Sequence, residues 1–399
     1  MILLRRLAAA SLIAAVVFFA VDQIGWRAIA LPPPATPGFA DVRFSAANEA
    51  ATRLLVQHRK QIDAPALSAA VAVNGAIIWS AAIGWADIEN ERAATPDTIF
   101  RIGSTSKALT ATLTGRLLDQ GIVALDTPIS EYSGQLPEHW RSLTLRQLHS
   151  HTAGMVGYEN NSDILGLIDS FLLWRRYDNV RDALSQFDDA SLTSEPGSTY
   201  AYSSFDVVLA SFILEQAAGR PFLEVMRDNV FDPAGLASTG ADHDLASQPD
   251  YAISYVTRNG RAKPWRRVDL SSKLASGGFS STSTDLVRLG VEYLHGDLLS
   301  RDAVHLLWTP QRLSTGEINE ESYAVGWRSQ LAYAEWLQKD VWIVHHGGIS
   351  KGAMSWLAIY PELDIVIALN MNARAESFRD FNSLSVKLAE LFYRSAAHK

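Results

Sequence analysis

Strand-like segments lie near both ends of this chain, and a long helical stretch separates them. Near the N-terminus, residues 67–73 and 76–83 flank Asn74-Gly75, a dipeptide typical of a two-residue hairpin. Near the C-terminus come four short apolar runs joined by turns that contain Gly or Pro, at 323–328, 341–346, 353–360 and 364–370. Runs this close in sequence favour antiparallel pairing. The pattern therefore predicts one antiparallel sheet built from both ends of the chain.

Helices are predicted to flank this sheet. Residues 46–61 form an amphipathic pattern, and a final helix is expected at 376–394, on the same face of the sheet. Between the strands, helical patterns at 163–175, 206–218 and 223–230 are separated by loops rich in Pro, Gly and Asp. We therefore expect an α+β fold, an antiparallel sheet flanked by helices plus an inserted, mostly helical lobe. The predicted boundaries are a sheet domain at 41–120 and 274–399 and a helical lobe at 121–273.

The first forty residues have a different character. Arg5 and Arg6 precede an apolar run at 7–21, and the small-residue pattern Ala28-Ile29-Ala30 follows. This predicts a signal peptide or an N-terminal membrane anchor at 1–30, then a Pro-rich linker at 31–40. The apolar run is short for a membrane span of roughly 20 residues, although 25–31 would lengthen an uncleaved anchor. We expect a periplasmic or extracytoplasmic protein, with anchoring to the inner membrane as the alternative.

Composition excludes several classes of function. The chain has no cysteine, which removes disulfides, thiol nucleophiles and thiolate metal sites. Its net charge of −8 does not suggest a nucleic-acid partner. The histidines of His149-Ser150-His151 and His345-His346 have no carboxylate at ligand spacing, so no metal site is expected. We expect no cofactor.

Ser104 and Lys107 are the strongest candidates for chemistry. A helix is predicted from about Ser104, because Leu109, Leu113 and Leu117 recur at four-residue spacing. Residues three apart share one face of a helix, so the lysine amine can reach the serine hydroxyl and remove its proton. Of the eight lysines, only Lys107 follows a serine at this spacing.

Several further segments resemble the penicillin-recognising serine hydrolases, which include class C β-lactamases and D-alanyl-D-alanine carboxypeptidases. The resemblance runs from about residue 46 to 391, and the chain is most similar to the serine β-lactamase-like peptidase subgroup. The matching segments are 95–104, 144–154, Glu195-Pro196-Gly197-Ser198, Tyr202-Ser203-Ser204, 276–282 and His345-His346-Gly347-Gly348. Their order and spacing agree with the family throughout.

The resemblance implies a role for each site residue. Ser104 would attack a carbonyl to form an acyl-enzyme, Lys107 would accept its proton, and Tyr202 would relay that proton to the leaving group. The N–H groups of Ser104 and Gly348 would form the oxyanion hole. The predicted substrate-binding residues are Ser204, His345, His346 and Gly347.

Two positions depart from the β-lactamase pattern. Ser204 stands where the second motif usually has Asn, and His345 stands where the third motif usually starts with Lys. A histidine with a pKa of about 6.5 is mostly neutral at pH 7, so it provides no fixed cation for a substrate carboxylate. Both departures weaken the expectation of efficient penicillin hydrolysis.

The sequence therefore predicts an exported serine hydrolase that acts on a peptide, amide or ester. A true β-lactamase or D-Ala-D-Ala carboxypeptidase is one alternative, and a non-catalytic cell-envelope binding or scaffold protein is the other. The expected partner is a small-molecule or peptide substrate, with cell-wall peptide as one candidate. A membrane contact is expected only if the N-terminal segment is retained.

Overall fold

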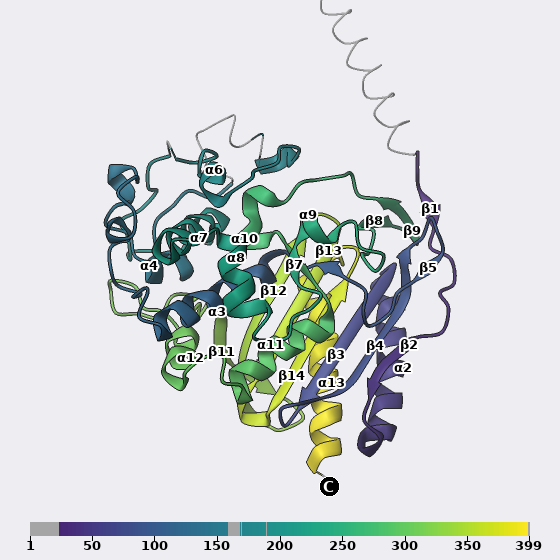
Figure 1. The fold of residues 1–399 in the computed structure, drawn as a ribbon. Helices are drawn as coiled ribbons and strands as arrows, with labels where there is room; N and C mark the ends of the chain where they lie inside the picture. Colours follow the sequence, from purple (N-terminus) through teal and green to yellow (C-terminus); the bar gives the residue numbers. More distant parts are fainter. Residues whose placement is uncertain (1–23, 159–167, 169, 189, 398–399) are drawn as a thin grey trace, which may run out of the picture.

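An antiparallel sheet built from both ends of the chain organises the fold (Figure 1). The computed structural model describes residues 24–158, 168, 170–188 and 190–397. The sheet has the strand order β11-β12-β13-β14-β3-β4-β2, and the short β5 (Arg92–Ala93) also pairs with β4. The main strands are β2 (Thr36–Ala40), β3 (Ala66–Val73), β4 (Ala76–Asp87), β11 (Arg328–Ala334), β12 (Lys339–Ser350), β13 (Ala353–Tyr360) and β14 (Ile365–Met371). The expected α+β fold is confirmed.

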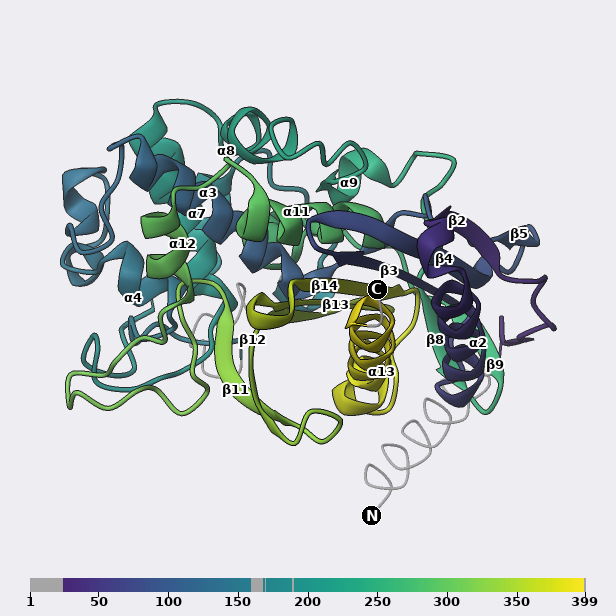
Figure 2. The same ribbon diagram turned by 90° about the horizontal axis from the view of Figure 1, so that it is seen from below.

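Helices cover the two faces of the sheet and bury separate cores. On one face, α2 (Ser45–Gln61) packs beside α13 (Phe378–Ala397) (Figure 2). On the other face lie α3 (Ser106–Asp119) and α11 (Ser283–His295). Strand residues alternate between the two cores, so that Val344 joins the α3 side and Ile343 the α13 side.

The inserted lobe lies on the α3 side of the sheet and contacts that helix. Its helices are α4 (Leu145–His149), α6 (Val180–Leu184), α7 (Ser204–Ala218), α8 (Phe222–Met226) and α9 (Asp242–Leu245). The lobe also contains short strands, β7 (Gly240–Ala241), β8 (Tyr255–Arg258) and β9 (Arg261–Pro264), so its last part is not helical. Of the predicted helix at 163–175, residues 163–167 and 169 lie outside the described residues, and 173–175 are not helical. Three short elements lead into or out of the site, β6 (Phe100–Arg101), α10 (Leu274–Gly277) and β10 (Phe279–Ser281), and α12 (Arg301–Trp308) follows α11.

The N-terminal segment packs against the domain from the first described residues. Residues 1–23 of the predicted signal peptide or anchor lie outside the described part. After them, β1 (Arg27–Ala28) pairs with β9, and β2 pairs with the edge of β4. Residues 36–40 are therefore a strand rather than a linker, because the outer edge of β4 supplies backbone groups that need partners. In the described part of the chain, no helix is long and apolar enough to cross a membrane.

The apolar run at 323–328 is not a strand, contrary to the prediction. β11 begins only at Arg328, and the residues before it form a turn buried against α3. Gly326 has φ of +74°, and a Cβ there would lie 2.5 Å from that of Ala111. Burial against a helix therefore explains this apolar run better than strand pairing does.

Candidate active site

Ser104 lies in a tight turn that leads into α3. The turn, Gly103–Thr105, is a 3₁₀ helix that follows β6, and β6 is held by pairing with β10. Gly103 has φ of +51°, and a Cβ there would lie 2.5 Å from the carbonyl oxygen of Ile349. Only glycine fits this combination of dihedral angle and close contact. The turn therefore places Ser104 directly beside the C-terminal end of β12.

Lys107 is completely buried, and its amine joins three segments of the chain. Lys107 Nζ lies 3.3 Å from Ser104 Oγ, 3.3 Å from Ser204 Oγ and 2.7 Å from the carbonyl oxygen of Ser276. Among the described residues, no carboxylate forms an ion pair with this amine. The tertiary fold thus brings Ser104, Lys107 and Ser204 together, although Ser204 lies nearly 100 positions away in sequence.

Tyr202 lies over the same amine but does not bond to it in this arrangement. The centre of its ring is 4.9 Å from Lys107 Nζ, and its side chain is half-exposed at the cleft. In the described part of the chain, its hydroxyl forms no hydrogen bond with Ser104 or Lys107. The ring packs on His151, with 4.3 Å between ring centres. The proton-relay role of Tyr202 therefore stays a prediction.

A buried polar group lies behind Lys107 and Tyr202. His151 Nδ1 is 2.7 Å from Asp206 Oδ2, and Tyr323 Oη is 2.8 Å from His346 Nε2. His151 has φ of +58°, which is rare for a residue with a side chain and is typical of strained functional sites. Burial, with Lys107 nearby, lowers the pKa of His151, and burial raises the pKa of Asp206. Burial therefore disfavours the charged form of each member of this pair.

The two histidines of the third motif point to opposite faces of β12. His346 lies on the α3 side, facing Tyr323 and Lys107, whereas His345 stacks on Trp356 on the α13 side. His345 was predicted to be the first residue of the third motif. The structure shows that His346 is the histidine that faces the nucleophile. Burial, and to a smaller extent the charge of Arg328, lowers the pKa of His345 to about 3. Burial, and to a smaller extent the charge of Lys107, also lowers the pKa of His346. Neither histidine carries a fixed positive charge at pH 7.

The strand register changes the predicted oxyanion hole. Lys351-Gly352 forms a two-residue turn, so Ser350 and Ala353 are the closing pair of the β12–β13 hairpin. Backbone N–H groups alternate between the two edges of an antiparallel strand, which directs the N–H of Gly348 toward β13. The N–H of Ile349 points to the opposite edge, beyond the end of β11 and beside Gly103. Ile349 therefore replaces Gly348 as the candidate donor.

Gly348 has a steric role instead. A Cβ at this position would overlap the carbonyl oxygen of Ile102 and lie 2.8 Å from the backbone nitrogen of Thr105. The absent side chain lets β12 approach the nucleophile turn.

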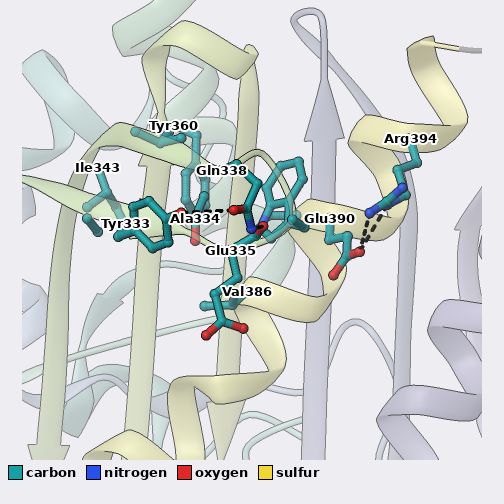
Figure 3. Close-up of a pocket in the computed structure, with 13 residues that line it drawn as sticks. Tyr333, Ala334, Glu335, Gln338, Ile343, Tyr360, Val386, Glu390 and Arg394 are labelled. Carbon is teal, nitrogen blue, oxygen red and sulfur yellow. Dashed lines mark hydrogen bonds and ion pairs between the residues drawn. The ribbon is translucent and has the colours of Figure 1, made fainter.

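Ser104 lies between two cavities that together form the cleft. One, of about 420 Å³, is lined by Tyr202, His345, His346, Gly347 and Ile349, among others. The other, of about 240 Å³, is lined by Ser204, Ser276, Ile349 and part of the helical lobe. A larger cavity of about 810 Å³ lies on the far side of the sheet, between the β11–β12 hairpin and α13 (Figure 3). It contains none of the predicted site residues.

Five site residues were missed from the sequence. His151 and Ser276 belong to segments that carried the family resemblance, but they received no role. Asp206 lies in the first turn of α7, four positions after Tyr202, and this closeness in sequence was the available signal. Tyr323 and Ile349 had none, because a buried tyrosine and a backbone amide look ordinary in sequence.

Comparisons with known proteins identify the family and support the fold. A model of the Beta-lactamase family matches residues 51–390. The chain is 26% identical to the serine beta-lactamase-like protein LACTB, mitochondrial, of Mus musculus, over 83% of this chain and 74% of that protein. It is 28% identical to penicillin-binding protein 4 of Amycolatopsis lactamdurans, over 70% of this chain and 74% of that protein. The crystal structure of D-amino acid amidase from Ochrobactrum anthropi SV3 has the same fold, with a TM-score of 0.71 and 21% identity over 89% of this chain and all of that one.

Proposed function

Because the chain belongs to the Beta-lactamase family of serine hydrolases, we propose that it cleaves a peptide, amide or ester through an acyl-enzyme on Ser104. The observation that carries the proposal is the buried amine of Lys107, 3.3 Å from the Ser104 hydroxyl and without an anionic partner among the described residues. An amine in such a place is suited to accept the hydroxyl proton.

The reaction then proceeds in two stages. Lys107 takes the proton of Ser104 while the Ser104 oxygen attacks the substrate carbonyl, and the N–H groups of Ser104 and Ile349 stabilise the negative oxygen. Tyr202 passes a proton to the leaving group as the carbonyl–leaving-group bond breaks, which leaves an ester on Ser104. A water molecule then attacks this ester, and its proton returns through the same groups to Ser104.

True β-lactamase activity is the weaker alternative. Neither His345 nor His346 supplies a fixed cation, and Ser204 donates no amide to a substrate, since it faces Lys107. We expect a chromogenic cephalosporin to acylate Ser104 slowly, with little turnover. Sustained turnover would favour the β-lactamase alternative over a peptidase or esterase.

A binding or scaffold function is the alternative of another class. The convergence of Ser104, Lys107 and Ser204 argues against it, because a scaffold has no need of a buried amine beside a hydroxyl. A protein that binds cell-wall peptide but reacts with no ester or amide would favour it.

Export to the periplasm stays part of the proposal, on the strength of the sequence at 1–30. Trp26 and β1 pack against β8 and β9, which supports a retained N-terminal segment over cleavage after Ala30. An alkaline phosphatase fusion reports export, and the mass of the purified protein reports cleavage.

Covalent labelling tests the function directly. A fluorophosphonate probe should label the protein at Ser104, and Ser104→Ala should abolish labelling without lowering the melting temperature. Labelling that persists in Ser104→Ala would show that another residue is the nucleophile.

A further inference from the structure

The two halves of the cleft differ in charge. In the Tyr202 half, the one arginine lining the cavity, Arg328, forms an ion pair with Glu321. The Ser204 half is lined by Lys273, Lys351 and Arg374 and, among the described residues, by no carboxylate. In the described part of the chain, none of these three cations forms an ion pair.

Lys351 is held in place within the Ser204 half. It lies at the tip of the β12–β13 hairpin, and its carbonyl oxygen accepts a hydrogen bond of 3.2 Å from the Arg101 guanidinium. Arg101 is itself buried in an ion pair with Asp242. The backbone of Lys351 is therefore fixed to the segment that carries Ser104, three residues after Arg101.

The neighbouring lysine is also oriented toward this half. Lys273 Nζ lies 4.5 Å from the centre of the Tyr158 ring, and Lys351 Nζ lies 5.4 Å from that of Phe171. An aromatic ring contacts one side of an ammonium group and leaves its other N–H donors available.

Grouping these cations is unfavourable, because like charges repel one another. Burial lowers the pKa of Lys351, and Lys273, Arg266 and Arg374 lower it further by repulsion. Such an arrangement is notable in a chain of net charge −8, where acidic partners are plentiful. A bound anion would relieve the repulsion and accept hydrogen bonds from the N–H groups of these side chains.

The position of Tyr202 indicates which part of the substrate lies here. Tyr202, the proposed proton donor to the leaving group, lines only the other half of the cleft. The leaving group therefore belongs beside Tyr202, and the acyl part belongs beside Lys351.

We propose that the Ser204 half of the cleft is an anion subsite that selects substrates whose acyl part carries a carboxylate. This rests on the proposed function, because it assigns a substrate class to the Ser104 site. Acidic peptides and half-esters of dicarboxylic acids both have this chemistry.

A pair of esters tests the subsite. The 4-nitrophenyl monoester of adipic acid ends its acyl chain in a carboxylate, and 4-nitrophenyl methyl adipate is its neutral counterpart. We expect kcat/KM to favour the anionic ester by about tenfold or more, a preference that high salt reduces. Lys351→Glu or Lys273→Glu should bring the ratio of the two kcat/KM values below one, and Lys351→Gln should lower it less.

Lys339→Glu is the matched control. It makes the same change in net charge at the exposed start of β12, outside both halves of the cleft, and should leave the ratio unchanged. A wild-type ratio near one that Lys351→Glu does not alter would overturn the subsite while leaving the hydrolase intact.

Loss of catalysis is distinguishable from loss of the subsite. If neither ester is hydrolysed and no probe labels Ser104, the proposed function fails. Calorimetry with monomethyl adipate then decides the subsite. Saturable binding that Lys351→Glu removes supports it, and absence of binding overturns it.

Discussion

At the scale of single residues, the surroundings of each hydroxyl decide which serine reacts. The stretch Ser104-Thr105-Ser106-Lys107 offers two serines near one lysine. Ser106 Oγ accepts a hydrogen bond of 3.2 Å from the Phe279 N–H and is fully buried, whereas Ser104 lines both cavities. The three-residue spacing to Lys107 predicted Ser104 as the nucleophile, and burial excludes Ser106 from that role.

Replacing the buried amine should remove nucleophile activation while keeping the fold. Lys107→Met preserves length and suits a buried site, so we expect the rate of fluorophosphonate labelling to fall by about 10² to 10⁴. The control Ser106→Ala should label at nearly the wild-type rate. Comparable losses in both variants would mean that the helix start, rather than the amine, limits the reaction.

At the scale of elements, the contact between β12 and the nucleophile turn positions the site. Two glycines make it possible, Gly103 in the turn and Gly348 in the strand. The Asn-Gly hairpin, most of the short apolar strands and the long helices followed from local sequence patterns. The turn at 323–328 was wrongly predicted as a strand, because a run of apolar residues buried against a helix has the same sequence pattern as a buried strand.

Gly348→Ala should separate β12 from the turn. The added Cβ would overlap the Ile102 carbonyl oxygen, so the strand must move, at a cost of about 2 kcal/mol or more in the free energy of unfolding. We expect kcat/KM to fall at least about tenfold as Ile349 moves away from Ser104. Gly134→Ala, where a Cβ meets no atom within 4 Å, is the control for urea unfolding. Wild-type activity in Gly348→Ala would contradict this role of the strand.

At the scale of the whole molecule, the cleft exists only because the lobe closes over the sheet. Lys107 comes from α3, Ser204 from the lobe, and Ser276 from the segment that returns to the sheet. Several histidines are buried in the folded molecule, and burial lowers the pKa of each of the following: His58, His149, His151, His345 and His346.

Stability should therefore fall as the pH drops below the ordinary histidine range. Burial lowers the pKa of His149 to about 4, from 6.5 in the unfolded chain, so between those values the unfolded chain binds a proton that the folded one does not. This residue alone should cost about 2 kcal/mol between pH 7 and pH 5. Urea unfolding at both pH values measures the loss, and His149→Gln should reduce it. A free energy of unfolding that does not change between pH 7 and pH 5 would contradict the prediction that these histidines are buried in the neutral form.

The sequence alone determined the sheet built from both ends, the flanking helices, and the pairing of Ser104 with Lys107. These depend on periodicity and on contacts a few residues apart, which local patterns record. The tertiary structure decided the rest: that His346 faces the nucleophile, that Ile349 rather than Gly348 offers its N–H, and that Lys273 and Lys351 meet beside Ser204. Those features depend on strand register and on segments far apart in the chain, and register is fixed only when the whole sheet and lobe have packed.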